Sequence, residues 1–370
     1  MKYMGSKKVM LKNGLGELLI DQSRKSNRIF DPFCGSASVS WFLAENTDNE
    51  VIAGDLQKYS IDLANAVLLR NKAIDENEKV ILQNWIETSQ RGLVQYAIDL
   101  PMKKTKKYVA ENKKYCNHSD FNITKAYGGY YFSFNQSITF DILLKYLPKD
   151  EPIKSIALAS LIEAASQCVA SPGHTAQPFG TTENGLKAIF DAWKRDPIEY
   201  INRFIEDLSK RHANNIGRGL VCEANNLLKE VGEGDLVFLD PPYSGVHYSR
   251  FYHVLETISR NQKITASGKG RYPAPDERPR SDFSLIGKSK DAMSLLLQNI
   301  SCKQASAILT FPADSCSNGL SGNTVKEISK KYFKVKKEII KGKFSTLCGN
   351  NYNRPARQAS AELVLLLEPK

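Results

Sequence analysis

The sequence predicts an open α/β fold with a mostly parallel sheet that is interrupted by a long, largely helical insert. Short apolar runs at residues 236–239 and 305–311 are typical of strands buried on both faces of a parallel sheet. A glycine-containing loop at residues 31–37 lies between a strand pattern and a helix pattern, as in a β-α-β unit. The length of 370 residues favours one large domain that carries an insert.

The N-terminal part of the chain contains the predicted start of this sheet. Residues 28–30 predict a short strand, and residues 39–45 predict the opening of a helix. Residues 50–54 predict a second strand, which ends at Asp55. The loop at residues 31–37 therefore connects the first strand to the first helix.

The middle of the chain predicts helices and irregular segments. Residues 153–169 indicate a buried helix, and the aromatic side chains of residues 127–134 are more often core packing than the lining of a base pocket. We interpret residues 72–217 as an insert within a single domain formed by residues 1–71 and 218–370.

The strand pattern resumes after the insert. Strands are expected at residues 219–222, 236–239 and 305–311. Residues 332–341 and 361–367 predict a final strand pair. Together with the two N-terminal strands, these segments are enough for a sheet covered by helices on both faces.

Composition excludes several classes of protein. The seven cysteines are scattered and never form a Cys-x-x-Cys pair, so neither a disulfide framework nor a metal site is expected. No apolar run approaches the roughly 20 residues that a membrane span needs. We therefore expect a reduced, cytoplasmic protein. Its net charge of +11 favours a polyanionic partner.

The strongest chemical signal is the segment DPPY at residues 240–243, which directly follows a predicted strand, where open α/β sheets bind ligands. It suits an exocyclic adenine amine, a weak nucleophile because its lone pair is delocalised into the ring. Asp240 and the carbonyl of Pro241 can accept the two amine hydrogens, while Pro242 stiffens the loop. Tyr243 offers a ring face on which a base can stack. A plain strand-end turn is the weaker interpretation, because other motifs accompany the segment.

Two further features favour a nucleotide-like ligand. In the loop DPFCGSA at residues 31–37, Gly35 lets the backbone approach a ligand closely. The loop is neither a dinucleotide fingerprint nor a P-loop, because the required glycines and lysine are missing. Asp55 ends the next strand, where a carboxylate can accept hydrogen bonds from ribose hydroxyls. Alone, such an aspartate is more often a turn residue, but the adjoining loop favours the binding role.

These segments together resemble the α-group of adenine-specific DNA methyltransferases, the DNA adenine methylase family. That family carries a Phe-x-Gly-x-Gly cofactor loop, an Asp-Pro-Pro-Tyr motif and a basic N-terminal motif similar to KYMGSK at residues 2–7. The resemblance covers roughly residues 1–60 and 215–260. It implies a Rossmann-like S-adenosylmethionine-dependent methyltransferase sheet, mostly parallel with an antiparallel C-terminal strand, and a target-recognition role for the insert.

The resemblance assigns seven residues to the cofactor S-adenosyl-L-methionine: Tyr3, Lys7, Asp31, Phe33, Gly35, Asp55 and Glu223. Tyr3 and Lys7 would contact its methionine end, with Lys7 near the carboxylate. Asp55 would hold the ribose, and Glu223 would contact the adenine. Asp240 would lie between the cofactor and the target amine.

One position departs from the family pattern. Phe33 and Gly35 match the cofactor loop, but Ala37 stands where the second glycine is expected. We expect its methyl group to be tolerated if the φ angle is negative. Ala37 is also the feature that favours an alternative, a weakly active or inactive protein that keeps the fold and binds DNA.

The function that the resemblance implies is methylation of the adenine amino group in duplex DNA, after the base flips out of the helix. Arg271, Arg278 and Arg280 share a loop downstream of the DPPY segment and are candidates for phosphate contacts. A restriction-modification or related defence setting, with a cognate restriction enzyme as partner, agrees with this function. Methylation of adenine in RNA or of a protein glutamine remains the alternative enzymatic interpretation.

Overall fold

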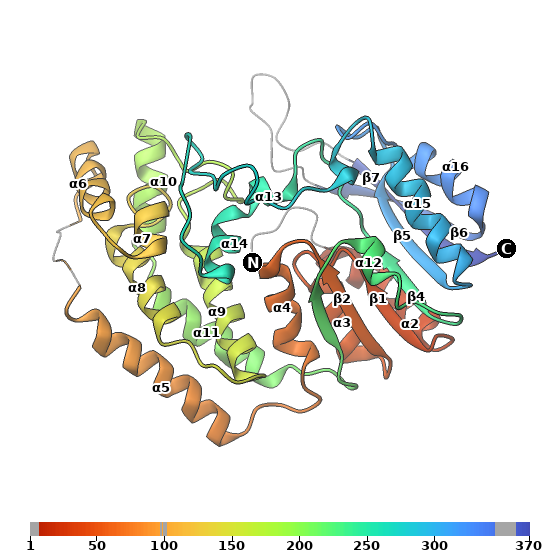
Figure 1. Ribbon diagram of the computed structural model, residues 1–370, viewed down its shortest axis with the longest axis horizontal. Helices are drawn as coiled ribbons and strands as arrows, with labels where there is room; N and C mark the ends of the chain where they lie inside the picture. The colour runs from red at the N-terminus through yellow and green to blue at the C-terminus, as the bar shows by residue number, and fades with distance from the viewer. Residues whose placement is uncertain (1–6, 97, 99–101, 345–359) are drawn as a thin grey trace.

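The computed structural model describes residues 7–96, 98, 102–344 and 360–370. The strands gather on one side of the molecule, and the helices from α5 to α11 gather on the other (Figure 1). No helix among the described residues is both long and apolar enough to cross a membrane.

A seven-stranded sheet in the order β3-β2-β1-β4-β5-β7-β6 forms the centre of the fold. Its strands are β1 (Arg28–Asp31), β2 (Glu50–Asp55), β3 (Arg218–Val221), β4 (Leu236–Leu239), β5 (Ser306–Pro312), β6 (Phe333–Phe344) and β7 (Ser360–Pro369). The pairs from β3 to β5 are parallel, whereas β7 runs antiparallel to both β5 and β6. The predicted α/β fold class, with a mostly parallel sheet and an antiparallel C-terminal strand, is confirmed.

Alternating side chains of the strands enter two different hydrophobic cores. In β1 and β4, Ile29 and Phe238 belong to one core, and Phe30 and Val237 belong to the other. The first core includes α2 (Gly16–Ser23), α3 (Ser38–Asn46) and α4 (Lys58–Leu68), and the second includes α12 (Ala224–Leu227), α15 (Ser289–Cys302) and α16 (Gly322–Tyr332). Burial on both faces explains why the strand sequences are continuously apolar.

A helical region lies between β2 and β3. Its helices after α4 are α5 (Glu76–Leu93), α6 (Lys106–Asn117), α7 (Asn122–Tyr127), α8 (Phe134–Lys145), α9 (Ile153–Cys168), α10 (Glu183–Trp193) and α11 (Pro197–Lys210). The aromatic residues Tyr127, Tyr131 and Phe132 are fully buried, which confirms that they are core packing. The role of residues 72–217 in target recognition stays a prediction.

The helical region and the sheet share one hydrophobic core. Helix α9 is buried nearly all round, and it packs on α4 and on α14 (His253–Arg260) where the two parts of the molecule meet (Figure 1). Shorter elements complete the chain: α1 (Lys8–Met10), the π-helix η1 (Leu11–Leu15), α13 (Tyr248–Phe251) and the 3₁₀ helix η2 (Asp282–Ser284). Because the core is continuous, the helical region is packed firmly against α4 and α14.

Candidate active site

Three aspartates lie together at one edge of the sheet. Asp31 ends β1, Asp55 ends β2, and Asp240 directly follows β4. These strands are neighbours in the order β2-β1-β4 and run parallel, so their carboxyl ends meet. Ligands of open α/β sheets bind at this edge.

Asp55 fastens the glycine-containing loop to the turn that follows β2. Its Oδ2 accepts a hydrogen bond of 2.9 Å from the backbone N–H of Gly35, and its Oδ1 accepts one of 2.9 Å from Gln57. Burial raises the pKa of Asp55 to about 6, although the same two N–H donors act in the opposite direction. Gly35 has a φ of 51°, a conformation that glycine adopts without a steric penalty.

Asp31 is enclosed beneath this loop. Its Oδ2 accepts a hydrogen bond of 2.6 Å from the Ser40 hydroxyl, and its Oδ1 has no hydrogen-bond partner among the described residues. Burial raises the pKa of Asp31 to about 7, and the nearby carboxylates of Asp240 and Asp55 add to that rise. The Asp31 carboxyl therefore titrates near neutral pH. Its position beneath the loop also supports the loop.

Ala37 does not meet the condition of a negative φ under which its methyl group was expected to be tolerated. Ala37 is fully buried at the N-cap of α3, with a φ of 57° and a ψ of 10°. The chain makes a tight turn there, in which the Ala37 N–H donates to the Cys34 carbonyl over 2.7 Å. A methyl group is therefore accommodated in the left-handed conformation that glycine would adopt freely, at a cost of roughly 1–2 kcal/mol.

A cavity of about 300 Å³ opens beside these elements. Phe33, Asp55 and Glu223, three of the predicted cofactor residues, line it together with Pro242 of the DPPY segment. Glu223 also caps α12, because its Oε2 accepts a hydrogen bond of 3.0 Å from the Asn225 N–H. Asp31, Gly35 and Lys7 do not line the cavity, and Tyr3 lies outside the described residues.

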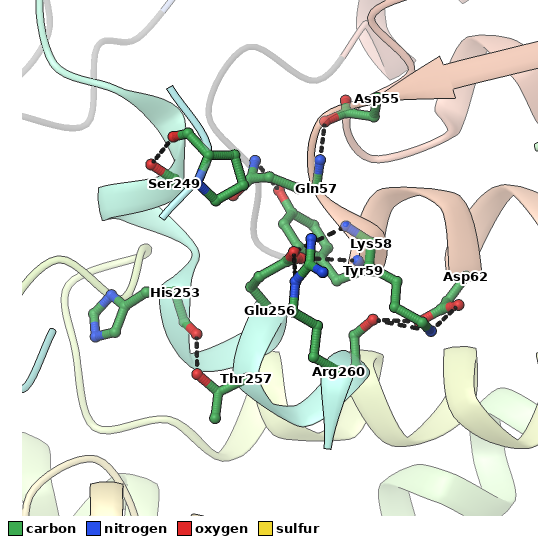
Figure 2. A network of polar contacts seen from close by, with 12 residues as sticks. Asp55, Gln57, Lys58, Tyr59, Asp62, Ser249, His253, Glu256, Thr257 and Arg260 are labelled. Carbon is green, nitrogen blue, oxygen red and sulfur yellow. Dashed lines mark hydrogen bonds and ion pairs between the residues drawn. The ribbon is translucent and has the colours of Figure 1, made fainter. Parts of the chain in front are cut away.

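Glu256 was not identified as a site residue from the sequence, yet it holds the turn after Asp55 in place. It projects from α14 towards the start of α4, next to Asp55 and Gln57 (Figure 2). Its two carboxylate oxygens accept hydrogen bonds of 3.1 Å from the backbone N–H groups of Lys58 and Tyr59. A carboxylate at a helix N-terminus also stabilises the helix dipole. The sequence signal that could have identified Glu256 was an acidic residue in the helix that follows the DPPY segment.

The DPPY segment is held by several polar contacts. Asp240 Oδ1 lies 2.9 Å from the Lys7 ammonium and accepts a hydrogen bond of 3.0 Å from the Thr310 hydroxyl of β5. Lys7 also contacts Glu362 of β7, at a distance of 2.5 Å. The sequence placed Lys7 near the cofactor carboxylate, whereas in the structure its ammonium lies on two carboxylates of the protein itself.

The remaining residues of the segment are anchored from the neighbouring elements. Pro241 is buried, and the Pro242 carbonyl accepts a hydrogen bond of 3.1 Å from the side-chain amide of Asn318. The half-buried Tyr243 ring packs edge-on against Phe311, with a distance of 6.4 Å between ring centroids. Both ends of the segment are therefore fixed before any ligand arrives.

The three predicted DNA-binding arginines are not equivalent. Arg271 donates hydrogen bonds of 2.8 Å and 3.0 Å to the carbonyls of Ala126 and Lys125, at the end of α7. Arg278 and Arg280 instead line a groove of about 330 Å³ next to the DPPY segment. The prediction of phosphate contacts is therefore carried forward for Arg278 and Arg280 only.

Arg250, which the sequence did not single out, joins these two arginines in the groove. Within the described part of the chain, none of the three guanidinium groups forms an ion pair with a carboxylate. His247, in the same groove, has a lowered pKa because of burial and then because of the positive charges of Arg280 and Arg278. The groove consequently carries positive charge that no described carboxylate pairs with directly.

The fold and the site together define an open α/β protein with a ligand cavity at the carboxyl ends of its parallel strands. Residues 3–274 match the D12 class N6 adenine-specific DNA methyltransferase family. The chain therefore belongs to this family, as the sequence motifs predicted. Membership of a methyltransferase family implies a methyl donor.

Individual relatives are more distant. The chain is 24% identical to modification methylase StsI of Streptococcus sanguinis over 312 residues, which cover 81% of this chain and 42% of the relative. It is 24% identical to type II methyltransferase M.FokI of Planomicrobium okeanokoites over 271 residues, covering 70% and 37%. Type II methyltransferase M.NlaIII of Neisseria lactamica is 31% identical over 120 residues, or 32% of each chain. The chain thus spans less than half the length of StsI and M.FokI, and its match to M.NlaIII is local.

Replacement of Ala37 tests whether its strained conformation is required. Ala37→Val is expected to lower the free energy of unfolding by about 2 kcal/mol, because a β-branched side chain is disfavoured at positive φ and the position is fully buried. Ala37→Gly loses a buried methyl group, worth about 0.8 kcal/mol, but relieves about 1 kcal/mol of backbone strain. Its stability should stay within about 1 kcal/mol of the wild type in urea unfolding. A valine variant as stable as the wild type would contradict the observed φ.

Proposed function

We propose that this protein transfers a methyl group from S-adenosylmethionine to the exocyclic amino group of adenine in duplex DNA. The observation that carries the proposal is Asp240, whose carboxylate is held through one oxygen at the end of a central strand, next to a cavity. Membership of an adenine-specific DNA methyltransferase family supports the same chemistry. The setting that we propose is restriction-modification, because the matched relatives are named modification methylases and type II methyltransferases.

The residues around the cavity fit a nucleoside-containing cofactor. Phe33 and Leu56 provide apolar surface for a ring, while Asp55 and Glu223 provide carboxylates for hydroxyl and amine hydrogens. The Asp55 oxygens each accept one backbone N–H, which leaves each of them a second lone pair. When bound, S-adenosylmethionine supplies an electrophilic methyl group.

The chain's own residues would prepare the amine for attack. The target base must leave the duplex, because its amino group cannot be reached within the stack. Asp240 Oδ2 and the Pro241 carbonyl would each accept one amine hydrogen, drawing the nitrogen lone pair away from the ring. Tyr243 would stack on the base, and its ring is already held against Phe311. Preorganised acceptors lower the barrier because they need no rearrangement during the reaction.

The mechanism predicts that Asp240 is indispensable for transfer but not for binding. Asp240→Ala should lower kcat by at least about 10²–10³-fold, the usual effect of removing one preorganised group. Lys7 keeps Glu362 as a partner, so the variant should fold and bind duplex DNA nearly as the wild type does. Methyl transfer and DNA affinity are measured side by side, with Asp276→Ala, an exposed carboxylate of the downstream loop, as the control. Near-native transfer by Asp240→Ala would refute the mechanism.

The raised pKa of Asp55 predicts a pH dependence of cofactor binding. Because the pKa is about 6, the carboxylate is charged above pH 6 and neutral below it. If the charged form holds the ribose hydroxyls, the Kd for S-adenosylmethionine should rise about tenfold between pH 7 and pH 5. Calorimetry across this range measures the change. Asp55→Asn should bind S-adenosylmethionine weakly at both pH values. If this variant kept the wild-type dependence of Kd on pH, a group other than Asp55 would be responsible for the titration.

The groove beside the DPPY segment predicts contacts with the phosphate backbone. We propose that Arg280, together with Arg250 and Arg278, binds phosphates of duplex DNA that flank the target adenine. Arg280→Gln should weaken duplex binding and reduce the slope of log K against log salt by about 1. Arg24→Gln is the control, because Arg24 is an exposed arginine paired with Asp21 of α2. An unchanged salt slope for Arg280→Gln would exclude this groove from the interface.

A further inference from the structure

Lys7 connects three segments that are far apart in the sequence. It lies near the N-terminus, Asp240 follows β4, and Glu362 belongs to the C-terminal strand β7. The Lys7 ammonium lies 2.9 Å from Asp240 Oδ1 and 2.5 Å from Glu362 Oε1, and only 4% of its side chain is exposed. The side chains of the two carboxylates are 19% and 12% exposed. The result is a nearly buried cluster of one cation between two anions.

The contacts of Asp240 are all on one of its two oxygens. Oδ1 lies against both the Lys7 ammonium and the Thr310 hydroxyl. Oδ2 has no hydrogen-bond partner among the described residues. One ion pair and one hydrogen bond on the same oxygen restrain the rotation of the carboxylate, so Oδ2 keeps its capacity to accept a hydrogen bond.

The charge state of Lys7 follows from its surroundings. Burial lowers its pKa, but the carboxylates of Asp240 and then Glu362 outweigh burial, so the pKa is raised above its ordinary value and the side chain stays protonated. A protonated lysine paired with Asp240 alone would be free to shift over both of its oxygens. Glu362, which lies on β7, also contacts the Lys7 ammonium and restrains it on Asp240 Oδ1.

We infer that Glu362 is a positioning residue: it holds the Lys7 ammonium on Asp240 Oδ1, so that Asp240 Oδ2 remains the acceptor for the target amine. This inference rests on the proposed function of Asp240. Glu362 also adds a second negative charge, which limits how strongly Lys7 withdraws electron density from the acting carboxylate. The strand order supports the arrangement, since β7 pairs with β5, the strand that carries Thr310.

The first experiment separates catalysis from binding in the full-length protein. Glu362→Gln is expected to lower kcat at least about tenfold, because small displacements of a catalytic group are costly. The Kd for S-adenosylmethionine and the KM for duplex DNA should change less than about twofold. Glu368→Gln is the matched control, since Glu368 lies on the same strand and pairs with Lys336 at the surface, at 3.2 Å. An unchanged kcat in Glu362→Gln overturns the inference, as does a rise in the cofactor Kd without a loss of kcat.

Two further measurements exclude a merely structural role. Glu362→Asp, which keeps the negative charge beside Lys7, should retain most of the kcat that Glu362→Gln loses. If Glu362 acts through Lys7, Glu362→Gln should cause little additional loss of kcat in a Lys7→Met background. Equal losses in both backgrounds would contradict the inference.

Failure of the proposed function can be distinguished from failure of the inference about Glu362. A wild-type protein that transfers no methyl group to adenine in duplex DNA refutes the proposed function. Urea unfolding of Lys7→Met, Glu362→Gln and the double variant tests the contact between Lys7 and Glu362 independently of enzymatic activity. Non-additive effects on the unfolding midpoint are expected for residues in contact, and additive effects would show that Glu362 does not hold Lys7.

Discussion

The parallel pairing of β2, β1 and β4 is the constraint on which the site depends. It brings Asp55, Asp31 and Asp240 to one edge of the sheet, although these residues come from distant positions in the chain. The pairing is itself a consequence of apolar side chains on both faces of each strand, which require helices above and below the sheet. Hydrophobic packing therefore decides where the charged groups of the site must lie.

Three carboxylates at one buried edge repel one another, and the fold compensates each of them differently. Asp55 receives two backbone N–H groups, and Asp240 receives Lys7 and the Thr310 hydroxyl. Asp31 receives one hydroxyl, from Ser40, and its pKa is the higher of the two raised values, about 7 against about 6 for Asp55. Burial is the main cause of both raised pKa values, and Asp31 is the more easily protonated of these two aspartates.

Local patterns in the sequence were sufficient for the strands and for the strand-end motifs. The predicted strand at 236–239 matches β4, and the helix predicted at 153–169 matches α9 within one residue. The φ of Ala37 could not be predicted, because the angle is set by the turn that joins the loop to α3 and not by the residue itself. Glu256 and the groove arginine Arg250 were missed for a related reason: their partners are distant in sequence, and only the packing of α14 and the downstream loop brings them together.

The contacts of Lys7 could be predicted only in part from the sequence. A basic residue near the N-terminus was recognisable from the motif, but its partners Asp240 and Glu362 lie on strands that only the folded sheet makes neighbours of the N-terminal segment. A catalytic carboxylate in a buried site needs a cation to remain charged, yet a cation that engages both oxygens would occupy the acceptor that the reaction needs. The observed geometry meets both requirements, because Lys7 and Thr310 share Oδ1 of Asp240 while the antiparallel strand β7 supplies the second anion. The C-terminal strand β7 therefore contributes Glu362 to the proposed site and also joins β5 to the edge strand β6.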